Sequence, residues 1–194
     1  MNAEFLSQMQ SLYQQLIQHD AYQTDRDLRY RNIKPESAHY ISMLIKIQTS
    51  KRILEIGTST GYLTLWMAES VLEHQGRVTT VDINSERTAL ATQYAKQFSL
   101  DHLIDFISSD AIDLLINEGD VYDLIILDAN RHAYPDYWHY LKKVLHPEHG
   151  VILVDKVISH AAEIQSFLKD VKADPDFCTM TLNIGCGLLM ITRN

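Results

Sequence analysis

Residues 52–62 read Arg-Ile-Leu-Glu-Ile-Gly-Thr-Ser-Thr-Gly-Tyr, an apolar run that ends in a turn containing two glycines. Residues 52–56 have the length and composition of a buried strand, and residues 62–73 continue with a helical pattern. Gly57 and Gly61 allow a tight turn and a close backbone approach, and the free N–H groups of the following helix point at the same place. The stretch therefore predicts a strand–turn–helix unit that binds a ligand. A glycine turn that binds nothing is the alternative.

Strand and helix patterns alternate along the rest of the chain. Apolar runs predict strands at residues 77–82, 104–108, 122–128 and 151–155, and a closing β pair at 177–183 and 188–192. Helical patterns cover residues 62–73, 85–98, 111–117, 134–145 and 160–172, with Ser85 as an expected N-cap. Strands joined by helices need crossover connections, so we expect an α/β fold with a mainly parallel sheet covered on both faces.

Two further helices are expected before this alternating region. Residues 4–19 carry apolar side chains at helical spacing, at Phe5, Met9, Leu12, Tyr13, Leu16 and Ile17. Pro35 suits the first turn of a second helix, whose apolar side we expect at Tyr40, Leu44 and Ile47. We expect one domain over residues 1–194, with N-terminal helices in 1–48 and a ligand-binding core in 49–194.

The charge balance limits the classes of partner. The chain has 194 residues with 17 basic and 25 acidic side chains, for a net charge of −8. A protein whose main task is binding nucleic acid or anionic lipid needs a basic face, which makes nucleic acid an unexpected partner. The local basic cluster Arg26, Arg29, Arg31 and Lys34 is the feature that favours it.

The beginning of the chain shows no signal-peptide pattern, and no apolar run reaches the ~18 residues of a membrane span. We therefore expect a cytoplasmic protein with no membrane partner. In that compartment Cys178 and Cys186 are expected to be reduced, buried and structural, with a disulfide across the closing β pair as the alternative.

Acidic side chains stand at or beside the ends of five predicted strands. They are Glu55, Asp82, Asp110, Asp128 and Asp155. In sheets of this kind ligands bind outside the carboxyl ends of the strands, so these acids are expected to surround one site.

The spacing of the glycines and of Asp82 indicates the kind of cofactor. An acid at the end of the second strand can accept hydrogen bonds from the hydroxyls of a ribose. A dinucleotide site would need G-x-G-x-x-G, whereas this turn reads G-x-x-x-G and follows Glu55, so a nicotinamide oxidoreductase is the weaker alternative. A carboxylate there suits a cationic cofactor, and S-adenosylmethionine carries a sulfonium and an ammonium. Its adenine is expected near Asp110 and Ala111.

Residues 52–68 and 76–82 resemble the small class I O-methyltransferases related to the catechol and caffeoyl-CoA enzymes. The similarity runs from about Ile33 to the C-terminus. It implies a Rossmann-like sheet of seven strands in the order 3-2-1-4-5-7-6, with the last strand antiparallel, and pairing as a homodimer. The predicted cofactor-binding residues are Ile33, Glu55, Gly57, Thr58, Gly61, Tyr62, Asp82, Ile83, Asp110, Ala111 and Asp128. The chain departs at Leu63, where the family usually has serine, and Thr64 is a candidate substitute.

The resembled family holds a divalent cation, usually magnesium, with Asp-Ala-Asp-Lys after the fourth strand and Asp-Asn after the fifth. This chain instead has Asp128-Ala-Asn-Arg131 and Asp155-Lys156. An ammonium is no metal ligand and repels a nearby dication by several kcal/mol at an effective dielectric of about 20. We therefore expect no bound metal; Asp128 and Asp155 would be its ligands only if a divalent ion were retained.

The predicted catalytic residues are Asp128, Arg131 and Lys156. The Lys156 ammonium could occupy the place of the cation and stabilise a developing oxyanion, or act as a base if its pKa were depressed. Alternatively Lys156 forms only an internal ion pair, and catechol-type activity is lost. Arg131 either orients an anionic substrate or caps the following helix as a solvated cation.

Other side chains near this segment have structural interpretations. Tyr134, Tyr137 and Trp138 share one helical stripe and are expected to pack in the core. His146 and His149 flank Pro147 in a loop and are expected to be structural or exposed.

The leading hypothesis is S-adenosylmethionine-dependent methylation of a hydroxyl oxygen in a small molecule. Two alternatives stay open. One is a tRNA-modifying O-methyltransferase, because some members of the resembled family modify tRNA. The other is a catalytically impaired homologue that binds S-adenosylmethionine or S-adenosylhomocysteine, which the substitutions at Asn130 and Lys156 favour.

Overall fold

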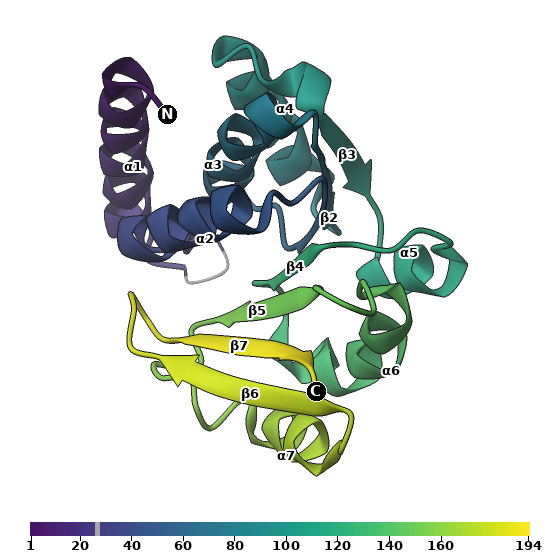
Figure 1. Ribbon diagram of the computed structural model, residues 1–194. Coiled ribbons are helices and arrows are strands. Elements are labelled where there is room, and N and C mark those ends of the chain that lie inside the picture. The colour runs from purple at the N-terminus through teal and green to yellow at the C-terminus, as the bar shows by residue number, and fades with distance from the viewer. Residues whose placement is uncertain (26–27) are drawn as a thin grey trace.

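A single seven-stranded sheet organises the computed structural model, which describes residues 1–25 and 28–194 (Figure 1). The strands are β1 (Arg52–Ile56), β2 (Arg77–Asp82), β3 (Ile104–Ser108), β4 (Leu124–Leu127), β5 (Val151–Asp155), β6 (Phe177–Leu182) and β7 (Leu188–Arg193). Their order is β3-β2-β1-β4-β5-β7-β6. β7 is antiparallel to both of its neighbours, and the pairs among β1 to β5 are parallel. The expected order and the antiparallel last strand are confirmed.

Helices cover both faces of this sheet. They are α1 (Ala3–Tyr22), α2 (Pro35–Gln48), α3 (Tyr62–Val71), α4 (Ser85–Gln97), α5 (Ala111–Asn117), α6 (Tyr134–Val144) and α7 (Gln165–Ala173), with 3₁₀ turns at Leu72–His74, Asp101–Leu103 and Arg131–Ala133. Successive side chains of a strand point to opposite faces. Ile53 accordingly packs in the core under α1 to α4, whereas Leu54 and Ile56 pack in the core under α5 to α7. Both cores meet at β1, where the glycine turn begins.

The N-terminal helices form largely as expected. Asn2 caps α1, whose buried face carries Phe5, Met9, Leu12 and Leu16. Pro35 begins α2, and the apolar side predicted for this helix is partly right: Tyr40 and Leu44 pack partly buried against the core, whereas Ile47 is 77% exposed. The fully buried apolar side chains are Ala38, Ile41 and Ile45, and α2 packs against α3. At this contact the hydroxyl oxygens of Ser42 and Ser70 lie 2.5 Å apart.

Three predicted boundaries need correction. Asn84, not Ser85, caps α4, because its side chain accepts the Arg87 amide. Strand β4 begins at Leu124 rather than at residue 122. Helix α7 begins at Gln165 instead of near residue 160, and residues 157–164 before it form turns whose first three amides donate to the carbonyls of Gly187 and Cys186.

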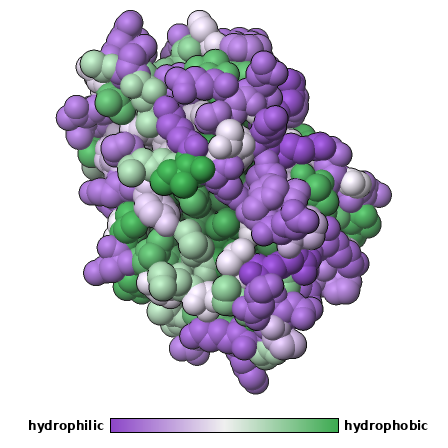
Figure 2. Space-filling model, in the orientation of Figure 1, coloured by the Kyte–Doolittle hydropathy of each residue, from purple (hydrophilic) through white to green (hydrophobic). Residues whose placement is uncertain are grey.

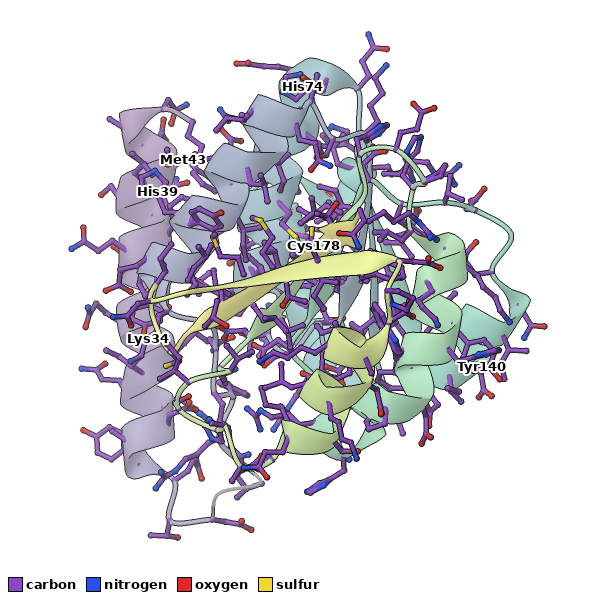
Figure 3. The ribbon with its side chains drawn as sticks, turned by 60° about the horizontal axis from the view of Figure 1, so that its bottom comes forward. Lys34, His39, Met43, His74, Tyr140 and Cys178 are labelled. Carbon is purple, nitrogen blue, oxygen red and sulfur yellow. The ribbon has the colours of Figure 1, made fainter. Side chains whose placement is uncertain are left out.

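No helix in the described part of the chain is both long and apolar enough to cross a membrane. Arg26 of the basic cluster lies outside the described residues. Cys178 and Cys186 are both free thiols, but neither is buried as expected: Cys178 is exposed on the edge strand β6, and Cys186 is half-buried. Figure 3 shows His39 and Met43 on α2, away from the sheet, and Cys178 on β6.

Candidate active site

The turn between β1 and α3 brings backbone against the end of β4. Gly57 has φ +107°, and a Cβ there would overlap the carbonyl oxygen of Asp128. Only glycine fits both the conformation and the space. Ser59 continues the turn with φ 48°, and its N–H donates to Asp82 Oδ2 at 2.8 Å. The turn is therefore held at the carboxyl ends of β1, β2 and β4.

A cavity of about 580 Å³ opens at this edge of the sheet. Six predicted cofactor residues lie in its wall: Gly57, Asp82, Ile83, Asp110, Ala111 and Asp128. Asp82 is fixed there, because its Oδ1 accepts the amide of Asn84 at 2.9 Å while Oδ2 accepts that of Ser59. The volume falls within the range of small-molecule sites.

The other five predicted cofactor residues do not line this cavity. They are Ile33, Glu55, Thr58, Gly61 and Tyr62. Four of them have buried side chains, and Gly61 immediately precedes α3 with φ +78°. They shape the turn from behind rather than form the cavity surface.

Glu55 lies directly behind the turn and accepts hydrogen bonds from two threonines. Thr64 and Thr80 donate to its Oε2 at 2.5 and 2.6 Å. Burial raises the pKa of Glu55 to about 8, against the effect of the two hydroxyl donors, and nearby Asp128 and Asp82 raise it further. The Thr64 hydroxyl is thus bound to Glu55, and Glu55 is largely protonated at neutral pH until a cation comes near.

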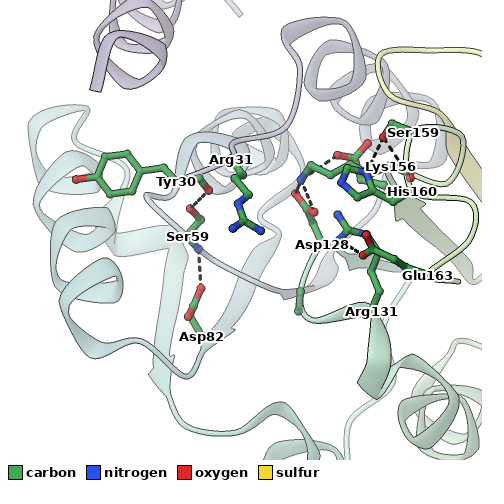
Figure 4. Close-up of polar contacts among 12 residues, drawn as sticks. Tyr30, Arg31, Ser59, Asp82, Asp128, Arg131, Lys156, Ser159, His160 and Glu163 are labelled. Carbon is green, nitrogen blue, oxygen red and sulfur yellow. Dashed lines mark hydrogen bonds and ion pairs between the residues drawn. The ribbon is translucent and has the colours of Figure 1, made fainter. Parts of the chain in front are cut away.

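Lys156 forms a charge cluster with Asp128 and Asp155 at this edge of the sheet (Figure 4). Its Nζ donates to Asp128 Oδ1 at 2.5 Å and to Oδ2 at 2.7 Å, and lies 3.5 Å from Asp155 Oδ2. The side chain of Lys156 is only 11% exposed and that of Asp155 1%. Lys156 has φ 64°, a left-handed conformation in which asparagine is far more common than lysine.

The charges of this cluster decide how Lys156 can act. Burial lowers the pKa of Lys156, but the attraction of Asp128 and Asp155 outweighs it and holds the pKa above its ordinary value. Burial, with repulsion from Asp128, raises the pKa of Asp155 to about 6. Lys156 therefore stays protonated at neutral pH, which opposes the idea that it acts as a base and leaves it as a fixed cation.

The residues present do not fit the magnesium site of the resembled family. The Lys156 ammonium already donates to both carboxylate oxygens of Asp128. Neither oxygen of Asp155 has a hydrogen-bond partner among the described residues. A magnesium ion needs several hard oxygen ligands and tolerates no cation at contact distance. This donor set supplies two carboxylates and one competing ammonium.

Arg131 lies in the cavity wall, close to the cluster. Its side chain is 13% exposed and donates to Glu163 Oε2 at 2.9 Å, so it is not a solvated surface cation. Its buried Nε has no partner among the described residues. Asn130, the second departure from the family motif, caps the following 3₁₀ turn by accepting the amide of His132. Tyr134 and Trp138 are buried as expected, and Tyr137 packs in the core with one side in the cavity wall.

Several cavity residues escaped the sequence analysis. Tyr30, Arg31, Ser59, Arg87 and Glu163 all line it. Tyr30 and Arg31 come from the segment before α2, and the Ser59 hydroxyl donates to the Tyr30 carbonyl at 3.0 Å (Figure 4). Asp20 anchors the same segment by accepting the amides of Tyr30 and Arg31. No spacing in the sequence links this segment to the turn, because the contact is tertiary.

Comparison with known proteins adds independent evidence. The sequence model of the O-methyltransferase family matches residues 4–194. Tapetum-specific methyltransferase 1 of Arabidopsis thaliana is 28% identical over an alignment of 222 residues, gaps included. The alignment covers 95% of this chain and 94% of that protein. A catechol O-methyltransferase of Niastella koreensis is 29% identical over 131 residues, or 66% of this chain and 58% of that protein.

The fold recurs in solved structures. The structure of an O-methyltransferase from Bacillus cereus in complex with SAH superimposes with a TM-score of 0.79 at 24% identity, and the match covers 95% of this chain and 91% of that one. With a seven-stranded sheet in the order 3-2-1-4-5-7-6, a glycine turn beside Asp82 and a family match over nearly its whole length, the chain belongs to the O-methyltransferase family.

Proposed function

We propose that this protein transfers the methyl group of S-adenosylmethionine to a hydroxyl oxygen of a small molecule, with a lysine ammonium in the place of a metal ion. The observation that carries the proposal is the contact of Lys156 Nζ with both carboxylate oxygens of Asp128. Asp128 lines the 580 Å³ cavity, and Lys156 lies behind it, outside the lining residues.

The cavity wall offers the groups that this cofactor needs. Asp82 would accept hydrogen bonds from the ribose hydroxyls, and Asp110 and Ala111 would flank the adenine. Gly57 lets the backbone approach closely, and Glu55 behind it would ionise in response to the cationic methionine end. When bound, S-adenosylmethionine supplies a methyl group on a positively charged sulfur. In-line attack by the acceptor oxygen would form the O–CH₃ bond and break the S–CH₃ bond, leaving S-adenosylhomocysteine and releasing the hydroxyl proton to solvent.

Lys156 would act through charge rather than through proton transfer. An ammonium beside an acceptor hydroxyl favours the alkoxide form and stabilises negative charge as it develops on the oxygen. Such a charge acts strongly here because the side chain is largely withdrawn from water, and its ion pair with Asp128 fixes its position. Arg131 and Glu163, paired in the wall, would orient the acceptor beside it.

Two measurements test this proposal. Isothermal titration should give saturable binding of S-adenosylmethionine and S-adenosylhomocysteine, and a panel of phenols and catechols should show methylation without added metal. Absence of cofactor binding at high micromolar concentration contradicts the proposal as a whole. Binding without methylation of any acceptor, or salt-dependent binding and methylation of tRNA, contradicts the small-molecule activity and favours one of the two alternatives.

We further propose that the protein is cytoplasmic, on the sequence grounds given above, and that two copies pair. The exposed apolar side chains Met43, Ile47 and Met180 support pairing. Figure 2 shows apolar residues gathered on the face of the molecule that carries β7 and β6. Light scattering should report a dimer that Met180→Lys weakens, and a monomeric wild-type protein contradicts pairing.

A further inference from the structure

Three metal-ligating side chains meet at the opposite edge of the sheet from the cavity. Asp123 immediately precedes β4, and His146 and His149 lie in the loop between α6 and β5. One ligand atom from each of the three lies within 4.8 Å of the others. This is the amino end of the parallel strands, whereas the cavity lies at their carboxyl ends.

Asp123 is held in place by the backbone of another strand. Its Oδ2 accepts the amides of Lys51 at 2.7 Å and of Arg52 at 3.0 Å. These bonds leave Oδ1 directed at His149 Nε2, which lies 3.0 Å away. Asp123 Oδ2 therefore binds backbone amides, whereas Oδ1 faces the imidazole of His149.

The two histidines are brought together by the loop itself. They flank Pro147, and their rings stack with centroids 3.5 Å apart. The Glu148 amide donates to His146 Nδ1 at 3.3 Å, which leaves Nε2 of that ring for a ligand. Gln48 at the end of α2 donates to the carbonyls of both Asp123 and His149, so it holds the two segments side by side.

We propose that Asp123, His146 and His149 bind a divalent transition-metal ion of the zinc class. Two imidazole nitrogens and one carboxylate oxygen are a zinc ligand set, with water completing a tetrahedron, whereas magnesium prefers oxygen ligands alone. Ligand distances of about 2.0–2.2 Å place tetrahedral ligand atoms roughly 3.4 Å apart. Asp123 Oδ1 and His149 Nε2, now 3.0 Å apart, would therefore separate slightly to admit the ion. The His149 side chain is 50% exposed, so the ion has access from solvent and the ring has room to move.

The ion would add a further link between segments that backbone pairing and the Gln48 side chain already hold side by side. It would fix the α6–β5 loop to the beginning of β4 and, through the Lys51 and Arg52 amides, to the beginning of β1. A ligand that binds the folded state alone raises its stability according to its concentration. Zinc should therefore raise the melting temperature without taking part in methyl transfer.

The test is zinc binding to the full-length protein without a histidine tag. We expect one Zn²⁺ ion per chain by isothermal titration, a rise in melting temperature with Zn²⁺ but not with Mg²⁺, and tetrahedral cobalt absorption when Co²⁺ replaces Zn²⁺. His146→Ala and His149→Ala should each weaken binding by at least about tenfold, since even the loss of an outer-shell partner costs a metal site roughly 10–100-fold.

His102→Ala is the matched control, because His102 is exposed and lies in the 3₁₀ turn before β3. It should leave zinc affinity unchanged. The proposal is overturned if the wild-type protein shows no saturable binding, or if both loop variants bind zinc as tightly as the control. Circular dichroism of each variant separates loss of the site from loss of the fold.

Discussion

Strand β4 has an aspartate at each end, and the two carboxylates have different partners. At the carboxyl end, Asp128 accepts both of its closest hydrogen bonds from the Lys156 ammonium. At the amino end, Asp123 accepts two backbone amides and faces the imidazole of His149. A fixed ammonium already supplies positive charge and excludes a metal ion, whereas imidazoles are ligands that share one. The partner of the aspartate thus decides what each edge of the sheet can bind.

The largest expected effect comes from removing the charge at the carboxyl edge. Lys156→Met should lower kcat by roughly 10²–10³-fold, the scale seen when one preorganised stabilising group is removed from a transition state. Cofactor affinity, measured by isothermal titration, should change only a few-fold. Lys169→Met, at an exposed position on α7, is the control. Unchanged kcat in the Lys156 variant would refute the role of the ammonium.

Rebuilding the carboxyl edge as a metal site tests whether the Lys156 ammonium accounts for the difference between the two edges of the sheet. Lys156→Asn combined with Asn130→Asp should restore oxygen ligands around Asp128 and Asp155 and make methylation of a catechol depend on magnesium. The φ of 64° at position 156 suits asparagine, so the backbone accepts this change. Activity assays across a magnesium titration give the answer. If the double variant is inactive at every magnesium concentration although folded, the two edges differ by more than this ammonium.

Glu55 predicts a pH dependence of folding. Its folded pKa of about 8 lies above its unfolded value, so the stability it contributes is present in full below about pH 4 and is lost as the pH rises to 8. Between pH 5 and pH 8 the free energy of unfolding of the wild type should therefore fall relative to Glu55→Gln, by on the order of 3–4 kcal/mol. Urea unfolding of both proteins across this range measures the difference. Parallel curves would contradict the raised pKa.

Asp82→Asn should have the smallest of these effects. The variant keeps the shape of the side chain but loses its charge, and it cannot accept both backbone amides and two ribose hydroxyls equally well. The dissociation constant for S-adenosylmethionine should rise about tenfold, because a hydrogen bond to a charged group contributes roughly 1.5–3 kcal/mol. Asp113→Asn on the exposed side of α5 is the control for charge alone. Equal affinities in the two variants would exclude Asp82 from the ribose site.

The features that could be predicted from the sequence are those that depend on a few neighbouring residues. Gly57 allows the turn its φ of +107°, and Asp82 is the last residue of β2, so the positions of both along the chain predicted which edge of the sheet carries the site. A short motif was also enough to show that Asn130 and Lys156 differ from the residues of the resembled family. The structure adds that Asn130 caps a 3₁₀ turn and that Lys156 pairs with Asp128.

Features that depend on tertiary contact could not be predicted in this way. Tyr30 and Arg31 reach the cavity only because Asp20 anchors their backbone there. Asp123 lies 23 residues before His146, and no spacing rule connects it to the histidine pair until β1 and Gln48 bring the segments together. The apolar side of α2 was predicted only in part for a similar reason, since tertiary packing buries Ala38, Ile41 and Ile45 fully and leaves Ile47 exposed.

The most direct test of the central claim is methyl transfer by tag-free protein after exhaustive treatment with a chelator. His146→Ala with His149→Ala is measured beside the wild type, so that any metal at the amino edge is accounted for. If Lys156 takes the place of the cation, both proteins methylate a small-molecule hydroxyl at undiminished rates, and added magnesium has no effect. Activity that the chelator abolishes and magnesium restores in both proteins would contradict the account.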